Sequence, residues 1–385
     1  MRTLLLFDGL GSTHEGLVPE LRRMYASPEN ATFFQSFLDT VDNVSDYLGT
    51  TASADRLSFR AVLEQRRPGQ GEPPVDSVAA GLCVYAYQTC HLQPTARHAD
   101  GAVAALGHSI GMLAAVIAGL RLRRMDDFIE TVTAFLRLMA VSLARAQELV
   151  ATANPEKSAV DRYRAMVHRG ADPGPMAALS GLPRHELAEM VDEFTRNGGS
   201  LSMSLANSPR SHVLSGPPTE LLEFYLQHAA TFERAGAIWT FLSNTIPFHS
   251  RHLASTVDRV GQDRRFIGKL PGGGQLQLAV YATDVPRNLQ SSSDFVDEFL
   301  QQVFLHPIDW EAVTGHAVAD AAIDRIVDYG PGAAARRFTK ECLGTAARSV
   351  QFAPIRPSVA SRAPGGHHAM STLSRPGRPT PRNGR

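Results

Sequence analysis

The sequence feature that most constrains the fold is a Gly-x-Ser-x-Gly pentapeptide set between two apolar segments. The pentapeptide spans residues 107–111, reads GHSIG, follows the apolar run 102–106 and precedes the apolar stretch 112–120. Between a strand and a helix, flanking glycines allow a tight turn that projects the serine hydroxyl at the carboxyl edge of a sheet. The pattern therefore predicts a strand, a turn and a helix, with Ser109 as a candidate nucleophile. A glycine-rich structural turn is the alternative interpretation.

Short apolar segments recur along the chain and alternate with helical patterns. Residues 4–7 form an uninterrupted apolar run that ends at Asp8-Gly9, and residues 276–281 and 325–329 are also strand-like. Short apolar runs are typical of strands buried on both faces of a parallel sheet. The predicted fold class is therefore α/β, with helices packed on a parallel sheet. The run at 4–7 is too short for a signal peptide.

The middle of the chain carries a different pattern. Strand-like and helix-like segments follow one another there in the order β-α-β-β-α-β, which is the order of the ferredoxin-like motif. The strands are predicted at 176–180, 201–206, 211–214 and 237–242, and the helices at 183–194 and 219–229. We therefore expect an inserted subdomain over 176–243 and a body made of 1–175 and 244–353, with a connector at 154–175. The tail 354–385 is rich in Pro, Gly, Ser, Arg and His, and is expected to be disordered.

The composition argues against several classes of protein. Lys plus Arg and Asp plus Glu number 38 each, so the chain has no basic excess of the kind that nucleic-acid binders carry. Its longest apolar stretch, 112–120, is too short to span a membrane, and we expect a cytoplasmic protein. Three sparse cysteines, Cys83, Cys90 and Cys342, predict buried thiols rather than a disulfide framework or a metal site.

A serine nucleophile needs a general base, and the chain has 14 histidines. His249 differs from the others because it lies in a PFHS segment directly after the last strand of the predicted subdomain. A proline and an aromatic residue restrict the backbone before this ring, which suits a histidine held over a cleft. An unrelated hydrolase with a Ser-Asp-His triad would instead use a late histidine, such as His306 or His316, and would lack the β-α-β-β-α-β block.

The GHSIG and PFHS segments together resemble the acyltransferase domains of fatty acid and polyketide synthases. Four further segments resemble the same family in the same order: NSPR at 207–210, VLSG at 213–216, HPIDW at 306–310 and DYGPG at 328–332. The resemblance covers nearly all of residues 1–350. It implies an α/β-hydrolase-like body with a parallel sheet and an inserted ferredoxin-like small subdomain.

The resemblance also implies roles for individual residues. Ser109 and His249 would form a catalytic dyad, with the second ring nitrogen of His249 oriented by a main-chain carbonyl near His306. The N–H groups of Leu10 and Ile110 would form the oxyanion hole. The further substrate-binding positions implied are Gly9, Gly11, His108, Ala134 and Asn207. The donor would be acyl-CoA and the acceptor an acyl carrier protein or polyketide synthase, with no metal or other cofactor.

One departure from the family bears on which acyl group is transferred. Malonyl-type members carry an arginine on the helix after the nucleophile, where its guanidinium pairs with the malonyl carboxylate. The matching position here is near Ala134, and Arg137 lies about one turn away. A lining without arginine favours an uncharged acyl chain. In this respect the chain most resembles the starter-unit acyl carrier protein transacylase domains.

Three alternatives stay open at this point. A thioesterase could use the same site if water reached the acyl-serine, and an extender-type malonyl transacylase would follow if Arg137 reached the site. A non-catalytic scaffold could keep the fold.

Arg210 and Arg251 are candidates for docking an acidic carrier protein, with ordinary surface arginines as the alternative.

Overall fold

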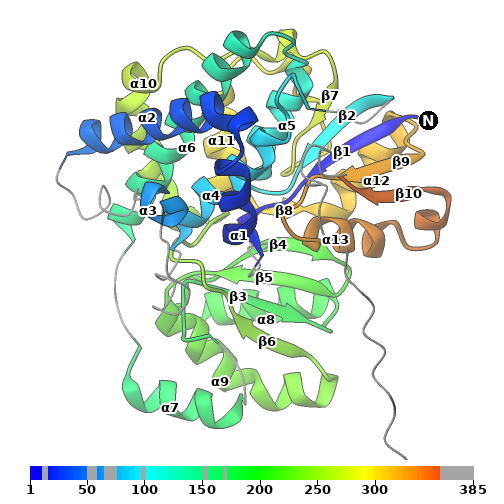
Figure 1. The fold of residues 1–385 in the computed structure, drawn as a ribbon. Helices are drawn as coiled ribbons and strands as arrows, with labels where there is room; N and C mark the ends of the chain where they lie inside the picture. Colours follow the sequence, from blue (N-terminus) through cyan, green and yellow to red (C-terminus); the bar gives the residue numbers. More distant parts are fainter. Residues whose placement is uncertain are drawn as a thin grey trace, which may run out of the picture. The chain divides into compact units, whose positions relative to one another are not determined.

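Two five-stranded sheets organise the computed structural model of the protein, which describes residues 1–10, 16–49, 59–64, 76–96, 101–150, 155–167 and 171–355 (Figure 1). The first sheet has the strand order β10-β9-β1-β2-β7, and every pair in it is parallel. Its strands are β1 (Thr3–Phe7), β2 (Ala102–Gly107), β7 (Ala279–Tyr281), β9 (Arg325–Asp328) and β10 (Gln351–Pro354). The predicted α/β class with a parallel sheet is confirmed.

Strand β1 lies at the centre of the parallel sheet, where all five of its residues are buried. Its sequence, TLLLF, has no charged side chain, as suits a strand with helices on both faces. In the register with β2, Phe7 lies opposite Gly107. The residues that follow these two strands, beginning with Asp8 and His108, therefore leave the sheet side by side at its carboxyl edge. Ligands of open α/β sheets bind at this edge.

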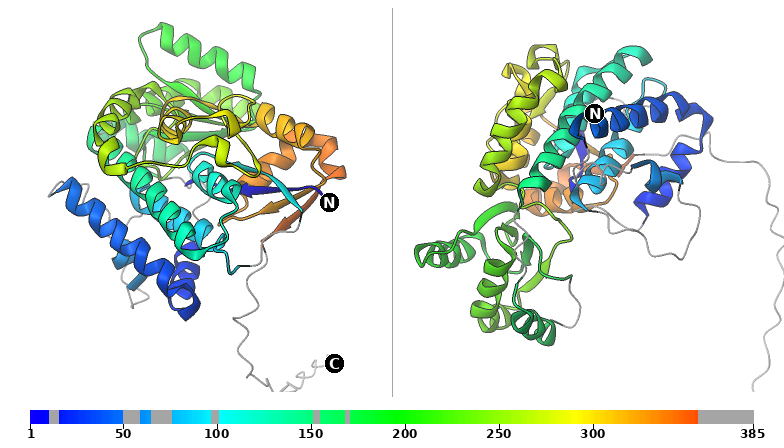
Figure 2. Two further views of the ribbon diagram at one scale, coloured as in Figure 1. Left: turned by 90° about the horizontal axis from the view of Figure 1, so that it is seen from above. Right: turned by 90° about the vertical axis from the view of Figure 1, so that its left-hand side faces the viewer.

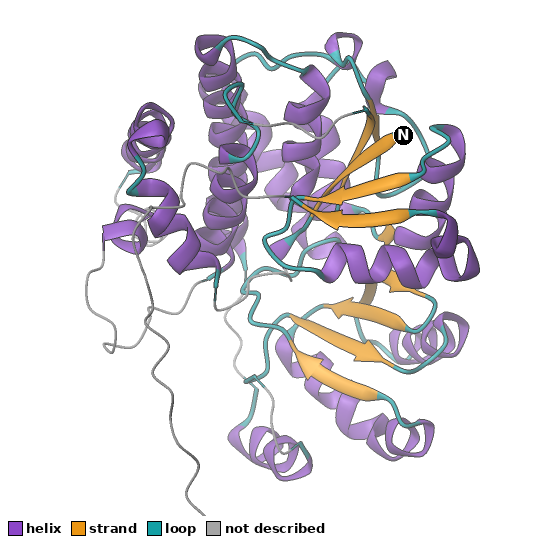
Figure 3. Cartoon of the chain, turned by 45° about the vertical axis from the view of Figure 1, so that its right-hand side comes forward, coloured by secondary structure: helices purple, strands orange, loops and turns teal. Residues whose placement is uncertain are grey.

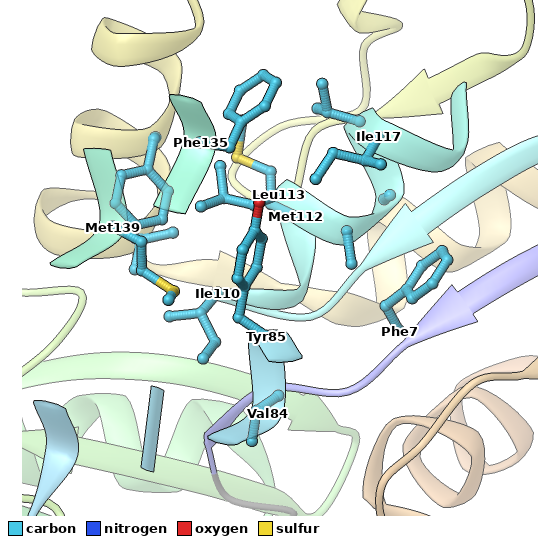
Figure 4. Close-up of a cluster of buried hydrophobic side chains, with 14 of the residues drawn as sticks. Phe7, Val84, Tyr85, Ile110, Met112, Leu113, Ile117, Phe135 and Met139 are labelled. Atoms are coloured by element: carbon cyan, nitrogen blue, oxygen red, sulfur yellow. The ribbon is translucent and has the colours of Figure 1, made fainter. Parts of the chain in front are cut away.

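Helices cover both faces of the parallel sheet (Figure 3). Two of them, α4 (Ser77–Cys90) and α5 (Gly111–Leu120), are almost wholly buried because their sequences are apolar on every side. Figure 4 shows Tyr85 of α4 among the side chains of Met112 and Met139. The other helices around this sheet are α1 (Leu17–Tyr25), α2 (Ala31–Leu48), α3 (Phe59–Glu64), α6 (Met125–Leu149), α10 (Ala254–Ile267), α11 (Phe295–Phe299), α12 (Trp310–Asp320) and α13 (Ala334–Leu343). None of the helices in the described part of the chain is long and apolar enough to cross a membrane.

The long helix α6 contacts both α2 and α10, and Figure 2 shows the three helices from two further sides. A single carboxylate joins them. Arg145 of α6 donates from Nε and Nη2 to the two oxygens of Asp263 on α10, at 2.9 and 3.1 Å. The hydroxyl of Tyr47 on α2 donates to the same carboxylate at 2.8 Å. Since both members of the ion pair are nearly buried, each depends on the other for its charge to be compensated.

The second sheet follows the predicted β-α-β-β-α-β order. Its elements are β3 (Met176–Ser180), α8 (Arg184–Arg196), β4 (Ser202–Ser208), β5 (Ser211–Ser215), α9 (Pro218–Ala235) and β6 (Ile238–Phe241). The strand order is β6-β3-β5-β4-β8, and the first three pairs are antiparallel. The short strand β8 (Ile308–Asp309) comes from later in the chain and pairs with β4 in parallel. The proposed boundary of a subdomain at 176–243 stays a prediction.

One expectation along the chain was wrong. Helix α7 (Lys157–Met166) lies in the stretch 154–175 that was predicted to be a connector. Tyr163 is its one fully buried residue, and Ala159 and Val160 pack partly buried against the same core. Helix α11 is followed directly by a π-helical turn at Leu300–Leu305. The predicted disordered tail lies outside the described residues from 356 onward.

Candidate active site

The GHSIG segment forms the predicted sharp turn between β2 and α5. Ser109 has a φ of 53°, in the left-handed region that a serine adopts only at a cost of about 1–3 kcal/mol. The glycines on either side relieve crowding. A Cβ on Gly107 would overlap the carbonyl of Gly111, and a Cβ on Gly111 would lie 2.6 Å from the carbonyl oxygen of Asp8. The turn therefore holds Ser109 where β1 and β2 both end.

Ser109 and His249 are brought together across 140 residues of sequence. The Oγ of Ser109 lies 2.8 Å from Nε2 of His249, and Nδ1 of the same ring lies 2.9 Å from the main-chain oxygen of His306. A carbonyl oxygen only accepts hydrogen bonds, so Nδ1 carries the proton and Nε2 is the acceptor. The Ser109 hydroxyl thus donates to the nitrogen that would take its proton.

A π-helical turn holds His249 in place. His249 has a φ of 55°, and its N–H donates to the carbonyl oxygen of Val303 at 3.2 Å, while the N–H of Ser250 donates to that of Phe304 at 2.9 Å. Both acceptors belong to the π-helical turn Leu300–Leu305. Wide turns of this kind are frequently found at functional sites. Two main-chain hydrogen bonds therefore fix the strained backbone that aims the imidazole at Ser109.

Burial controls the ionisation of the site. His249 is 2% exposed, and this burial lowers its pKa to about 3, with the hydrogen bond to His306 acting in the opposite direction. The imidazole is therefore neutral at physiological pH, as a general base must be. Burial also raises the pKa of each of the three cysteine thiols to about 12, so none is a thiolate at neutral pH.

A cavity of about 190 Å³ opens onto the dyad. Four of the predicted site residues besides Ser109 and His249 line it, namely Gly9, Leu10, His108 and Asn207. Much of the remaining wall is apolar and comes from both sheets and from α13, through Met176, Ala178, Leu205, Val213, Leu242, Phe248, Ala334, Ala335 and Phe338. The lining is thus a mainly apolar surface around the Ser109–His249 pair, as small-molecule sites commonly are.

His108 and Asn207 bind each other rather than pointing at open space. Nε2 of His108 lies 2.8 Å from Oδ1 of Asn207, and burial lowers the pKa of His108. The neutral ring then donates its Nε2 proton to the amide oxygen. The ring packs against Trp310 in an edge-to-face contact, with 4.8 Å between ring centroids. This hydrogen bond connects the serine turn to β4 and so fixes the width of the cavity between the two sheets.

Other predicted residues lie elsewhere. Gly11 lies outside the described residues. Ile110 is buried at the start of α5, where its main-chain N–H lies beside Ser109 in sequence. Ala134 is buried in α6 and is not among the described residues that line the cavity. Arg137 donates from Nε to the carbonyl oxygen of Ile267 at 3.3 Å, at the end of α10, and it too is absent from the described lining.

Two features of the site were not found from the sequence. Arg337, on α13, lines the cavity and follows the DYGPG segment, the last motif that the sequence offered. Asp284 accepts a hydrogen bond from Nδ1 of His306 at 2.9 Å, behind the carbonyl that orients His249.

Arg210, a predicted docking residue, donates to the carbonyl oxygen of Gly181. Within the described ranges, no group of three or more His, Cys, Asp or Glu side chains is placed to hold a metal ion.

Comparison with known proteins adds a family to this geometry. The model of the family described as "Starter unit:ACP transacylase in aflatoxin biosynthesis" matches residues 5–239, more than half of the chain. The fatty acid synthase beta subunit TOXC of Cochliobolus carbonum is 28% identical over 179 residues. That match covers 42% of this chain and 8% of TOXC, so the chain spans a small part of this relative.

Solved structures of malonyl transacylases share the fold. The malonyl-CoA:acyl carrier protein transacylase of Xanthomonas oryzae pv. oryzae superimposes with a TM-score of 0.62 at 16% identity, covering 92% of this chain and 95% of its own. PlMCAT, solved in complex with the type II polyketide synthase acyl carrier protein AntF, gives a TM-score of 0.63 at 18% identity, covering 94% and 97%. By the extent of its family match, this chain belongs to the starter unit:ACP transacylase family, among the acyltransferases of fatty acid and polyketide biosynthesis.

Proposed function

We propose that the protein transfers an acyl group from a thioester donor, acyl-CoA, to the phosphopantetheine thiol of an acyl carrier protein, through an ester on Ser109. The observation that carries this proposal is the line of hydrogen bonds from Ser109 through His249 to the carbonyl of His306. An activated serine at the end of an apolar cavity suits acyl transfer. The carrier-protein complex of the related PlMCAT supports an acyl carrier protein as the partner.

The proposed reaction has two matching halves. His249 takes the Ser109 proton on Nε2 while Oγ attacks the thioester carbonyl carbon, and the oxyanion is held by the N–H groups of Leu10 and Ile110. The carbon–sulfur bond then breaks, and His249 returns the proton to the leaving thiolate. The thiol of the carrier enters, gives its proton to His249 and attacks the carbonyl carbon of the Ser109 ester. The bond from that carbon to Oγ then breaks, and His249 returns the proton to the Ser109 hydroxyl. These steps use only groups of this chain and need no metal or redox cofactor.

We further infer that the acyl group is an uncharged starter unit. Arg337 is the single Lys or Arg among the described residues that line the cavity, and its side chain is 65% exposed. A malonyl carboxylate placed deep in the cavity beside Ser109 would therefore be buried without a partner, which costs several kcal/mol. Asp8 also lines the inner part of the cavity. An apolar acyl chain avoids both costs.

The arrangement of the sheets supports the same assignment. We infer that the parallel sheet is the core of an α/β-hydrolase-like body and that residues 176–243 are a ferredoxin-like insertion. The strand order β6-β3-β5-β4 and the antiparallel pairing of these strands agree with this interpretation.

The proposal is tested by intact-protein mass spectrometry after incubation with acetyl-, hexanoyl- and malonyl-CoA. Stable adducts from the two uncharged donors, absent in Ser109→Ala and retained in the exposed control Ser158→Ala, are expected. Transfer of the adduct to a holo carrier protein completes the test. Adducts from malonyl-CoA alone would overturn the starter assignment. Release of free CoA without an adduct or a loaded carrier would show a hydrolase, and no reaction with any donor would favour a scaffold.

A further inference from the structure

Arg337 and Ser109 lie on one cavity, but they differ sharply in exposure. Ser109 is 8% exposed, whereas the side chain of Arg337 is 65% exposed. Among the described lining residues Arg337 is the single Lys or Arg. The cavity thus has a buried reactive end and an exposed cationic rim.

The packing of Arg337 leaves its charge available. The guanidinium carbon lies 4.8 Å from the ring centroid of Phe338, and Nε lies 3.8 Å from a carboxylate oxygen of Glu341 on the next turn of α13. An exposed ion pair of this length contributes about 0–1 kcal/mol. An anionic ligand can therefore displace Glu341 at little cost. The neighbouring Arg336 differs, because it faces the buried carboxylate of Asp328 at 3.5 Å.

We propose that Arg337 binds the phosphate of the phosphopantetheine arm while the thioester at the other end of that arm reaches Ser109. This inference rests on the proposed acyl transfer and names the part of the substrate that the rim recognises. A guanidinium matches phosphate oxygens through parallel N–H donors. At an exposed rim the phosphate keeps part of its hydration, so its charge is not buried at full cost. The same phosphate is carried by CoA and by the holo carrier protein.

The decisive experiment compares donors that differ only in the phosphate. Ser109 acylation rates are measured by intact mass with hexanoyl-phosphopantetheine and hexanoyl-pantetheine, for the unmodified protein and for Arg337→Ala. We expect Arg337→Ala to lower kcat/KM for the phosphorylated donor about tenfold and to leave the rate with hexanoyl-pantetheine unchanged. Hexanoyl-CoA and a hexanoyl-loaded carrier protein, used in parallel, show whether one or both sources of the phosphate are recognised.

Two control variants keep the proposal falsifiable. Lys340→Ala removes a cation one turn further along α13, where its ammonium lies over the Phe352 ring, outside the described lining; it should change neither rate. Arg337→Lys should restore part of the lost rate because it keeps a point charge. A second groove, of about 390 Å³, reaches His249 from another side and is lined by Arg251. Arg251→Ala tests whether the phosphate binds there instead.

Each outcome separates this inference from the proposed function. An equal loss with both donors in Arg337→Ala, or a phosphate-specific loss in Arg251→Ala instead, would overturn the role of Arg337. With malonyl-CoA as a further donor, a loss confined to it would overturn the phosphate site and show that Arg337 binds an acyl carboxylate. If the unmodified protein is acylated by no donor, the acyl-transfer proposal itself fails. If it is acylated and Arg337→Ala makes no difference, only the phosphate site fails.

Discussion

The ring of His249 is oriented by the main-chain oxygen of His306, 2.9 Å from its Nδ1 atom. The side chain of His306 is in turn held by the carboxylate of Asp284, at 2.9 Å. Asp284 is nearly buried, while the His306 ring is about half exposed. The carboxylate therefore adds a side-chain anchor to His306, whose main-chain N–H also donates to the carbonyl oxygen of Gln301 at 2.7 Å. The carbonyl that fixes the tautomer of His249 depends indirectly on an acidic residue far from the substrate.

Removing this anchor should slow the reaction without changing substrate binding. We expect Asp284→Ala to lower kcat for Ser109 acylation about tenfold with little change in KM, since the base is less well oriented. Asp284→Asn keeps an oxygen that can accept from His306 and should retain most of the activity. Single-turnover acylation across a range of acyl-CoA concentrations separates the two parameters. A rise in KM with unchanged kcat would contradict a positioning role.

The rate of acylation should hardly change through the usual titration range of histidine. Because burial holds the pKa of His249 at about 3, the ring is already neutral at pH 5. The acid limb of a kcat/KM profile for hexanoyl-CoA should therefore lie below pH 5, and not near 6.5. The profile is measured by single-turnover acylation between pH 5 and 8. A tenfold fall between pH 7 and 5.5 in a protein that stays folded would show that the base titrates normally.

The same burial makes the fold sensitive to acid. The pKa of His249 is lower in the folded state than its ordinary value of 6.5, so the unfolded chain binds the proton first as the pH falls. The contribution of the neutral ring to the free energy of unfolding is therefore fully present above pH 6.5. It is lost progressively as the pH falls toward 3. By pH 5 the loss is about 2 kcal/mol. Urea unfolding at pH 7 and 5 should show a smaller loss for His249→Gln than for the unmodified protein, and equal losses would refute this account.

The sequence predicted those parts of the site that depend on local chain geometry. The serine turn was visible because strand, glycine-flanked serine and helix follow one another within 20 residues. His249 was found from its resemblance to a family motif, together with its place after a strand. Arg337 and Asp284 were missed because each reaches the site only through tertiary packing, from helix α13 and from the loop after β7. Periodicity reports which face of an element is buried, not which distant residue it meets.

Helices were predicted or missed for a similar reason. The buried helix α5 was predicted because its sequence, directly after the serine turn, is apolar throughout. Helix α7 was missed because its apolar face is short: Tyr163 packs against Tyr225 and Phe241, with Ala159 and Val160 only partly buried beside it. A helix of ten residues with so narrow an apolar face gives only a weak pattern in the sequence.

The buried ion pair between Arg145 and Asp263 should be costly to break. Asp263→Ala leaves the guanidinium with only Glu148 as an anionic partner and also removes the acceptor of Tyr47. We expect a loss of about 3–5 kcal/mol in the free energy of unfolding. The exposed pair Arg60 and Asp42 provides a control, since Asp42→Ala should cost no more than about 1 kcal/mol. Urea denaturation of both variants makes the comparison, and similar losses would argue against a buried clamp.

The serine turn should tolerate no side chain at Gly111. A Cβ there would lie 2.6 Å from the carbonyl oxygen of Asp8, and since both are main-chain groups neither can move without shifting β1 or α5. We expect Gly111→Ala to lower the free energy of unfolding by about 3 kcal/mol and to abolish acylation of Ser109. Gly261, in helix α10, has no atom within 4 Å of an added Cβ, so Gly261→Ala should stabilise the protein by up to about 1 kcal/mol. An active, fully stable Gly111→Ala protein would show that the close approach of α5 to β1 does not fix the nucleophile.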